Sequence, residues 1–220
     1  MNTAMPHSCS RAEGRYTHPV LFYGSPHKAG NTRRLVEQVC PGLPLAAEPE
    51  IISAYDLRIR PCCDCRSCYH GECPLNDDGM GELLEKFQQA DLLICALPIY
   101  FNGLPAPMKA IVDRSQQLFV KRFVQREAVS SPLRPGILLT TAGSPDRISN
   151  SGGGAMEGAY SSPAVSVSGG VREIIRMFYG CLGVSLAGHI ALSDMDQSPD
   201  IAVDPSQIQE IRRRLQEWQI

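Results

Sequence analysis

Short apolar segments alternate with amphipathic segments along most of the chain. Five segments are short and largely apolar, as buried parallel strands are: residues 18–23, 50–57, 91–97, 136–141 and 184–192. Apolar residues recur at helical spacing over residues 31–40, 80–89, 108–120 and 171–181. Asp78 is the expected cap of the second of these helices, and a last helix is expected to begin at Asp204 or Ser206. Repeated β–α units predict an α/β protein with a five-stranded parallel sheet that helices cover on both faces.

The segments outside this pattern suggest the domain organisation. Residues 1–17 are polar and are predicted to form a flexible N-terminal arm, while residues 18–220 are predicted to form a single domain. Residues 143–169 are rich in glycine and serine, and a stretch of that length is either a functional lid or a disordered excursion.

Composition narrows the class of protein. Of 220 residues 43% are hydrophobic, which is enough for a real core, and the formal net charge is −2. That balance gives no electrostatic reason to expect nucleic acid or an anionic membrane as a partner. No apolar run approaches the ~20 residues of a membrane-spanning helix, and the N-terminus lacks the apolar region of a secretory signal. We therefore expect a cytoplasmic protein.

The loop over residues 24–32 joins the first expected strand to the first expected helix. Free N–H groups and the dipole at a helix N-terminus favour an anion, and two glycines allow the chain to approach it closely. Short polar side chains and one cation add to this cradle: Ser25, Asn31, Thr32 and Lys28. The alternative is an ordinary turn capped by Asn31 or Thr32. Neither a Walker motif nor GxGxxG is present, which disfavours ATP and dinucleotides.

The run GSPHKAGNT in this loop resembles the GSPRxxGNT loop of the NADPH-dependent FMN reductase family. That family has a flavodoxin-like doubly wound sheet of order 2-1-3-4-5, and its loop binds the FMN phosphate. The resemblance implies that FMN is held by Ser25, His27, Lys28, Asn31 and Thr32. His27 stands where the family usually has arginine, and histidine is often neutral at pH 7. The phosphate is then either bound more weakly than in the family, or Lys28 supplies the missing positive charge.

A second loop, residues 98–103, follows the third expected strand. In a sheet of that order both loops lie at the switch point, where ligands bind. The loop could offer amides and stacking rings to a flavin, or its aromatic residues could simply cap the core. The run PIYFNGLPAPMKAIVDR resembles the PxYxxxxPxxxKxxxDR segment of the same family. This implies cofactor contacts by Pro98, Ile99, Tyr100, Phe101, Asn102 and Gly103.

The resemblance extends to the helix and strand that follow. We interpret Lys109, Asp113 and Arg114 as interface or scaffold residues, since the first two form an i,i+4 pair on a helix. In the family this helix helps to form a homodimer, so a homodimer is implied here. The resemblance also implies that the backbone of Thr141, Ala142 and Gly143 lies next to the pyrimidine edge of the flavin.

Five of the nine cysteines lie between residues 62 and 73. Without Cys63 their spacing is C-x2-C-x2-C-x4-C, one residue longer than a bacterial ferredoxin run. The segment resembles the compact motif of iron–sulfur flavoproteins, a branch of the same group, which also precedes an acidic pair and a helix. The implied ligands of a 4Fe-4S cluster are Cys62, Cys65, Cys68 and Cys73. A loop without metal, such as a redox-active dithiol, stays open, and the dense spacing argues against zinc.

Together these motifs predict an FMN-dependent oxidoreductase. Electrons would pass from NAD(P)H as co-substrate to a quinone, a flavin or a protein acceptor, with any 4Fe-4S cluster as a further carrier. No side chain stands out as a catalytic acid or base. The alternatives are a non-enzymatic electron carrier and a protein that uses its cysteine loop structurally or for regulation.

Overall fold

The structure is a computed structural model that describes residues 14–127, 133–145, 166–196 and 201–218. Its centre is a five-stranded sheet of order β2-β1-β3-β4-β5, in which every neighbouring pair is parallel. The strands are β1 (Pro19–Tyr23), β2 (Glu50–Ser53), β3 (Leu92–Pro98), β4 (Arg134–Thr141) and β5 (Val184–Leu192). This confirms the predicted fold class and strand order.

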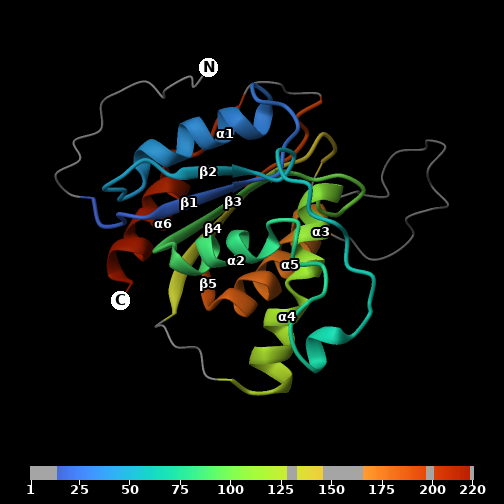
Figure 1. Ribbon diagram of the computed structural model, residues 1–220. Helices are drawn as coiled ribbons and strands as arrows, with labels where there is room; N and C mark the ends of the chain where they lie inside the picture. The colour runs from blue at the N-terminus through green and yellow to red at the C-terminus, as the bar shows by residue number, and fades with distance from the viewer. Residues whose placement is uncertain (1–13, 128–132, 146–165, 197–200, 219–220) are drawn as a thin grey trace, which may run out of the picture.

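Helices cover both faces of the sheet (Figure 1). One face packs against α1 (Asn31–Val39) and α6 (Pro205–Glu217), and the other against α2 (Met80–Gln89), α3 (Ala106–Arg114) and α5 (Val167–Leu182). Alternate residues of a strand point to opposite faces, which is why Leu21 joins the first core and Phe22 the second. The central strand β3 is buried on both faces, as its unbroken apolar run predicted.

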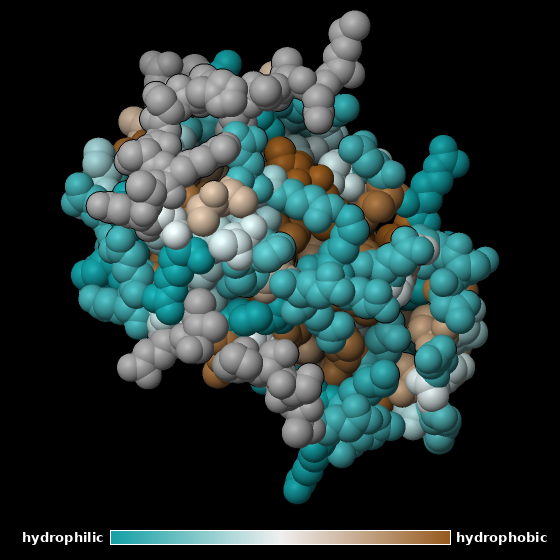
Figure 2. Space-filling model, turned by 60° about the vertical axis from the view of Figure 1, so that its left-hand side comes forward, coloured by the Kyte–Doolittle hydropathy of each residue, from teal (hydrophilic) through white to brown (hydrophobic). Residues whose placement is uncertain are grey.

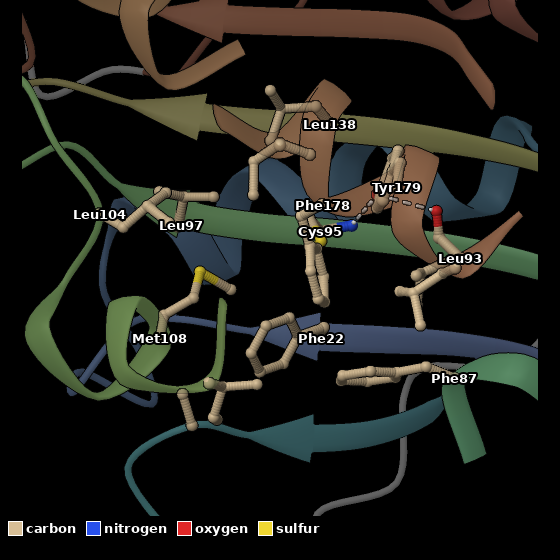
Figure 3. Packing of buried hydrophobic residues seen from close by; sticks show 14 of the residues in the cluster. Phe22, Phe87, Leu93, Cys95, Leu97, Leu104, Met108, Leu138, Phe178 and Tyr179 are labelled. Carbon is tan, nitrogen blue, oxygen red and sulfur yellow. Dashed lines mark hydrogen bonds between the residues drawn. The ribbon is translucent and has the colours of Figure 1, made fainter. Parts of the chain in front are cut away.

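Tyr179 of α5 is the main polar group inside the second core (Figure 3). Its hydroxyl group donates to the carbonyl oxygen of Ile137 at 2.7 Å and accepts from the amide of Cys95 at 3.1 Å. Gly136 makes this approach possible, because a Cβ atom there would overlap the tyrosine ring. Burial raises the pKa of Tyr179 well above its ordinary value, so the hydroxyl stays protonated.

Several boundaries differ from the sequence prediction for local reasons. The single helix expected over residues 108–120 is divided, because the Ser115 hydroxyl donates to the carbonyl of Ile111 where α3 ends. A short helix α4 (Gln116–Phe119) and a π-helical turn η4 (Val120–Val124) follow. The helix α5 begins four residues earlier than expected, since Ser166 caps it by accepting from the amide of Gly169.

The predicted flexible arm is wrong for its last residues. Tyr16 is fully buried, and its hydroxyl group donates to the carbonyl of Leu215 at 2.7 Å. Arg15 also donates to carbonyls at the end of α6, which ties this segment to the C-terminal helix. Residues 1–13 and most of the Gly/Ser-rich segment, residues 146–165, lie outside the described residues.

Some large apolar side chains lie outside the two cores and are exposed, among them Phe101, Phe123 and Met177. In the view of Figure 2, hydrophobic residues reach the surface only in patches between polar ones. Among the described residues, no helix combines the length and the hydropathy that crossing a bilayer requires.

Replacing Tyr179 with phenylalanine tests the polar link inside the core. The variant removes the hydroxyl group that bonds the amide of Cys95 and the carbonyl of Ile137 in the core, so we expect the free energy of unfolding in urea to fall by about 1 kcal/mol. Tyr69→Phe is the control, because its exposed ring has no hydroxyl partner in the described residues. Equal losses in the two variants would contradict this role of Tyr179.

Candidate functional site at the carboxyl edge of the sheet

The loops that follow β1, β3 and β4 lie side by side at one edge of the sheet. The amide of Gly24 donates to the carbonyl of Ala96, and the amide of Ile99 donates to the carbonyl of Thr141, both at 2.8 Å. The hydroxyl groups of Thr32 and Thr141 share a buried hydrogen bond of 2.8 Å. The parallel register therefore brings together the three loops that the sequence singled out.

The loop over residues 24–32 presents an N-terminus without a side-chain cap. Gly30 is the N-cap of α1, so the alternative of a cap by Asn31 or Thr32 is wrong. Within the described residues the amides of Asn31 and Thr32 have no acceptor, and the first turn of the helix carries no acidic residue. Exposed Lys28 adds a positive charge beside these donors. Such an end attracts an anion.

Some of the predicted phosphate ligands already have protein partners. Ser25 is buried, and its hydroxyl oxygen accepts from the amide of His27 at 3.2 Å. The Thr32 hydroxyl bonds Thr141, as described above. The hydroxyl group of Tyr23 donates a hydrogen bond to the carbonyl of His27 at 2.8 Å, which helps to fix the conformation of the turn. The side chains of Ser25 and Thr32 thus shape the cradle, and their contact with phosphate stays a prediction.

The loop over residues 98–103 forms a tight two-residue turn. Tyr100 and Gly103 exchange both backbone hydrogen bonds, at 3.1 and 2.9 Å. Phe101 and Asn102 between them have φ values of 48° and 56°, which places both in the left-handed region. A phenylalanine costs about 1 kcal/mol or more there, yet its ring is completely exposed and packs against no other described residue. Core capping therefore does not explain Phe101, whereas Ile99 is buried and does cap the core.

Other polar groups of this turn face the same edge. The amides of Phe101 and Asn102 have no acceptor among the described residues. Tyr55, which follows β2, lies near Tyr100, and both rings are about two-fifths exposed. The sequence analysis missed Tyr55, and its position just after a strand on the same side of the sheet was the signal that could have found it.

The segment after β4 is only partly as expected. The amide of Ala142 donates to the carbonyl of Leu192 at 2.8 Å, so it is not free for a ligand. The amide of Gly143 has no acceptor among the described residues, and a Cβ atom on Gly143 would overlap the carboxylate of Asp196. Asp196 was not anticipated from the sequence, because nothing in its surroundings resembled a motif.

The cysteine loop lies beside the C-terminal end of α3. Cys62, Cys65, Cys68 and Cys73 line one cavity of about 30 Å³ together with Arg114. Asp64 and Arg66 adopt left-handed backbone conformations, with φ values of 51° and 60°, and wrap the loop around this cavity. A side chain that follows α4 and η4 also holds this loop, since Gln125 donates a hydrogen bond to the carbonyl of Tyr69.

The thiols of this loop differ in environment. Hydrogen bonds from Ser67 lower the pKa of Cys65, which is fully exposed. Burial, together with the neighbouring Cys62, Cys65 and Cys73 thiols, raises the pKa of Cys68. Cys62, Cys65 and Cys73 thus lie near Cys68, in agreement with the cavity that the four residues line.

The four cysteines border one cavity. Within the described residues no three histidine, cysteine or acidic side chains converge closely enough to hold one metal ion. In a 4Fe-4S cluster each cysteine meets a different iron at a separate corner. The cluster therefore stays a prediction, and so does the loop without metal.

Asp78 caps α2 only in part. Gly79 is the N-cap, but the Asp78 carboxylate accepts from the amide of Met80 at 3.3 Å, and it also forms a buried salt bridge of 2.8 Å with Arg114. Burial opposes ionisation, but the hydrogen bonds from Arg114 and from the amide of Arg60 lower the pKa of Asp78. Arg114 is thus a scaffold residue, while Lys109 and Asp113 form the expected exposed pair at 2.6 Å.

Sequence comparison agrees with this geometry. The profile of the NADPH-dependent FMN reductase family matches residues 18–150, which include the three loops and the cysteines. The chain belongs to this family. Membership of this family places FMN among the expected ligands of the chain.

Individual relatives of this FMN reductase family member include iron–sulfur flavoproteins. One from Methanocaldococcus jannaschii is 39% identical over 97 residues, covering 43% of this chain and 50% of the relative. Another from Methanosarcina thermophila is 32% identical over 117 residues, covering 51% and 60%. The chain thus spans about half to three-fifths of the length of these relatives. The solved NAD(P)H:quinone oxidoreductase from Methanothermobacter marburgensis matches with a TM-score of 0.57 at 18% identity, covering 93% and 98%, and supports the fold.

The left-handed conformation of Phe101 predicts that this residue lowers the stability of the cofactor-free protein. Asparagine tolerates the left-handed region, so Phe101→Asn should raise the free energy of unfolding of the cofactor-free protein by about 1 kcal/mol. Tyr100→Asn, at a neighbour with negative φ, is the control and should give no gain. A Phe101→Asn protein that is less stable than the parent in urea would show that the ring contributes packing.

Proposed function

We propose that this protein binds FMN at the carboxyl edge of β1, β3 and β4 and transfers electrons from NAD(P)H to a quinone, a flavin or a protein acceptor. The observation that carries the proposal is the joint placement of an uncapped helix N-terminus and a strained aromatic turn on adjacent strands. FMN, when bound, supplies the hydride and electron chemistry. The protein binds, orients and shields the ring system.

The residues divide this work between the two ends of the ligand. The amides of Asn31 and Thr32, with Lys28 and His27, would hold the phosphate. The amides of Phe101, Asn102 and Gly143 would donate to the polar edge of the ring system. The exposed rings of Tyr100 and Phe101 offer flat apolar surface for stacking.

The cysteine loop supports a second redox group. Cys62, Cys65, Cys68 and Cys73 would hold a 4Fe-4S cluster, which supplies one-electron transfer. The relatives named iron–sulfur flavoproteins support this assignment. The loop borders the end of α3, a nine-residue helix about 13 Å long that begins at Ala106, with two residues between it and the turn at residues 98–103. We further propose a homodimer, which sedimentation analysis of the purified protein would test.

Lys28 provides a test of the phosphate cradle that does not depend on turnover. Lys28→Gln removes a positive charge next to the amides of α1, so FMN should bind about 5-fold more weakly, while riboflavin affinity should not change. Lys86→Gln is the control, because Lys86 pairs with Glu50 at the amino end of the sheet. Equal weakening of FMN and riboflavin would place the phosphate elsewhere.

The proposed reaction is tested by anaerobic stopped-flow absorbance. Protein loaded with FMN should bleach at the flavin bands when mixed with NADH or NADPH and recover when a quinone is added. An FMN-loaded protein that neither nucleotide bleaches, but that a reduced one-electron donor does, would overturn the enzymatic proposal in favour of a non-enzymatic electron carrier. The cysteine loop is the feature that favours this second candidate.

A further inference from the structure

Arg114 joins both ends of the cysteine loop to α3. Its side chain is 1% exposed, and it donates to the carbonyl of Arg60 at 2.9 Å, before the cysteines. It also donates to the carbonyl of Leu75 and to the carboxylate of Asp78, after them. One buried guanidinium group therefore closes the segment from residue 60 to residue 78 into a loop.

The same side chain faces the cavity that the thiols share. Arg114 lines this cavity, and its guanidinium group lies within hydrogen-bonding reach of the Cys73 thiol. Its Nε atom is buried and has no other acceptor among the described residues, so this N–H group is available to a sulfur acceptor in the cavity. Burial by itself lowers the pKa of Arg114, but Asp78 and the nearby Cys73 thiol raise it, so it remains a cation.

The other charged groups near the cavity are poorly placed to replace it. Asp64 and Arg66 pair with each other at 3.9 Å, and both side chains are more than three-quarters exposed. Charges in that position are screened by water. Arg114 is thus the buried charged residue that lines the cavity, and Asp78 behind it pairs with Arg114 and also with the half-exposed Arg60.

We propose that Arg114 is a positioning residue that fixes the cysteine loop on α3 and turns one spare N–H group toward an anionic sulfur-rich group in the cavity. The second half of this inference rests on the proposed 4Fe-4S site, and the first half does not. A cation and donor beside the cluster stabilise its reduced, more negative state, whereas Asp78 opposes that effect. Removing either partner should then shift the reduction potential in opposite directions.

The first measurement uses the metal-free full chain. Trypsin cleavage after Arg66 reports opening of the loop, since that residue is exposed and lies between the cysteines. Arg114→Gln and Asp78→Asn should each speed this cleavage about tenfold. The first removes the side chain that bonds the carbonyls of Arg60 and Leu75, and the second leaves the buried guanidinium group without its carboxylate. Lys109→Met, which breaks an exposed pair on the same helix, is the control and should cleave like the parent. Unchanged cleavage in Arg114→Gln would overturn the proposal.

The second measurement uses protein reconstituted anaerobically with iron and sulfide and titrated by electron paramagnetic resonance. The midpoint potential should fall in Arg114→Gln and rise in Asp78→Asn, and it should return near the parent value in the double variant, which buries no lone charge. A loop that was only disordered would shift both single variants in the same direction, and that result would overturn the donor role. If the parent takes up no cluster, the proposed cluster fails, and the order of the cleavage rates alone decides the role of Arg114.

Discussion

The parallel pairing of β3 with β1 and β4 is the constraint on which the site depends. Register places Tyr23 beside Ala96 and Pro98 beside Thr141, so the three strands end together. Each following loop is then bonded to its neighbour strand, as Gly24 is to Ala96 and Ile99 to Thr141. Since a slip of one residue would turn every strand side chain to the wrong face, the apolar pattern of the core also fixes where the loops meet.

The stable core allows the edge to carry features that cost stability. Below the site the aromatic residues Phe22, Phe87 and Phe178 pack with centroids 4.9 to 6.3 Å apart, and Tyr179 bonds to two central strands (Figure 3). At the edge, by contrast, an exposed phenylalanine holds a left-handed conformation and several amides lack acceptors. Strain and unpaired donors that gather at one edge of a well-packed fold are typical of a binding site.

Periodicity and motifs were sufficient for the fold, and they singled out three loops that the structure brings together. Buried strands such as β3 are read directly from an apolar run closed by proline, and the strand order followed from the resemblance. Side-chain partners were not readable in this way. Asp78 carried a capping pattern, but the buried cation of Arg114, distant in the sequence, competed for it. Tyr55 and Asp196 reach the edge only through tertiary placement, and Tyr16 is buried by a C-terminal helix that no local pattern connects to it.

The central claim is that FMN occupies the carboxyl edge between the loops after β1, β3 and β4. Hydrogen–deuterium exchange with and without FMN tests it most directly. The account expects slower exchange in peptides that contain residues 24–34, 98–104 and 141–144, and unchanged exchange at the amino end of the sheet around residues 17–20 and 86–90. Protection at the amino end, or no protection of the three loops by saturating FMN, would contradict it.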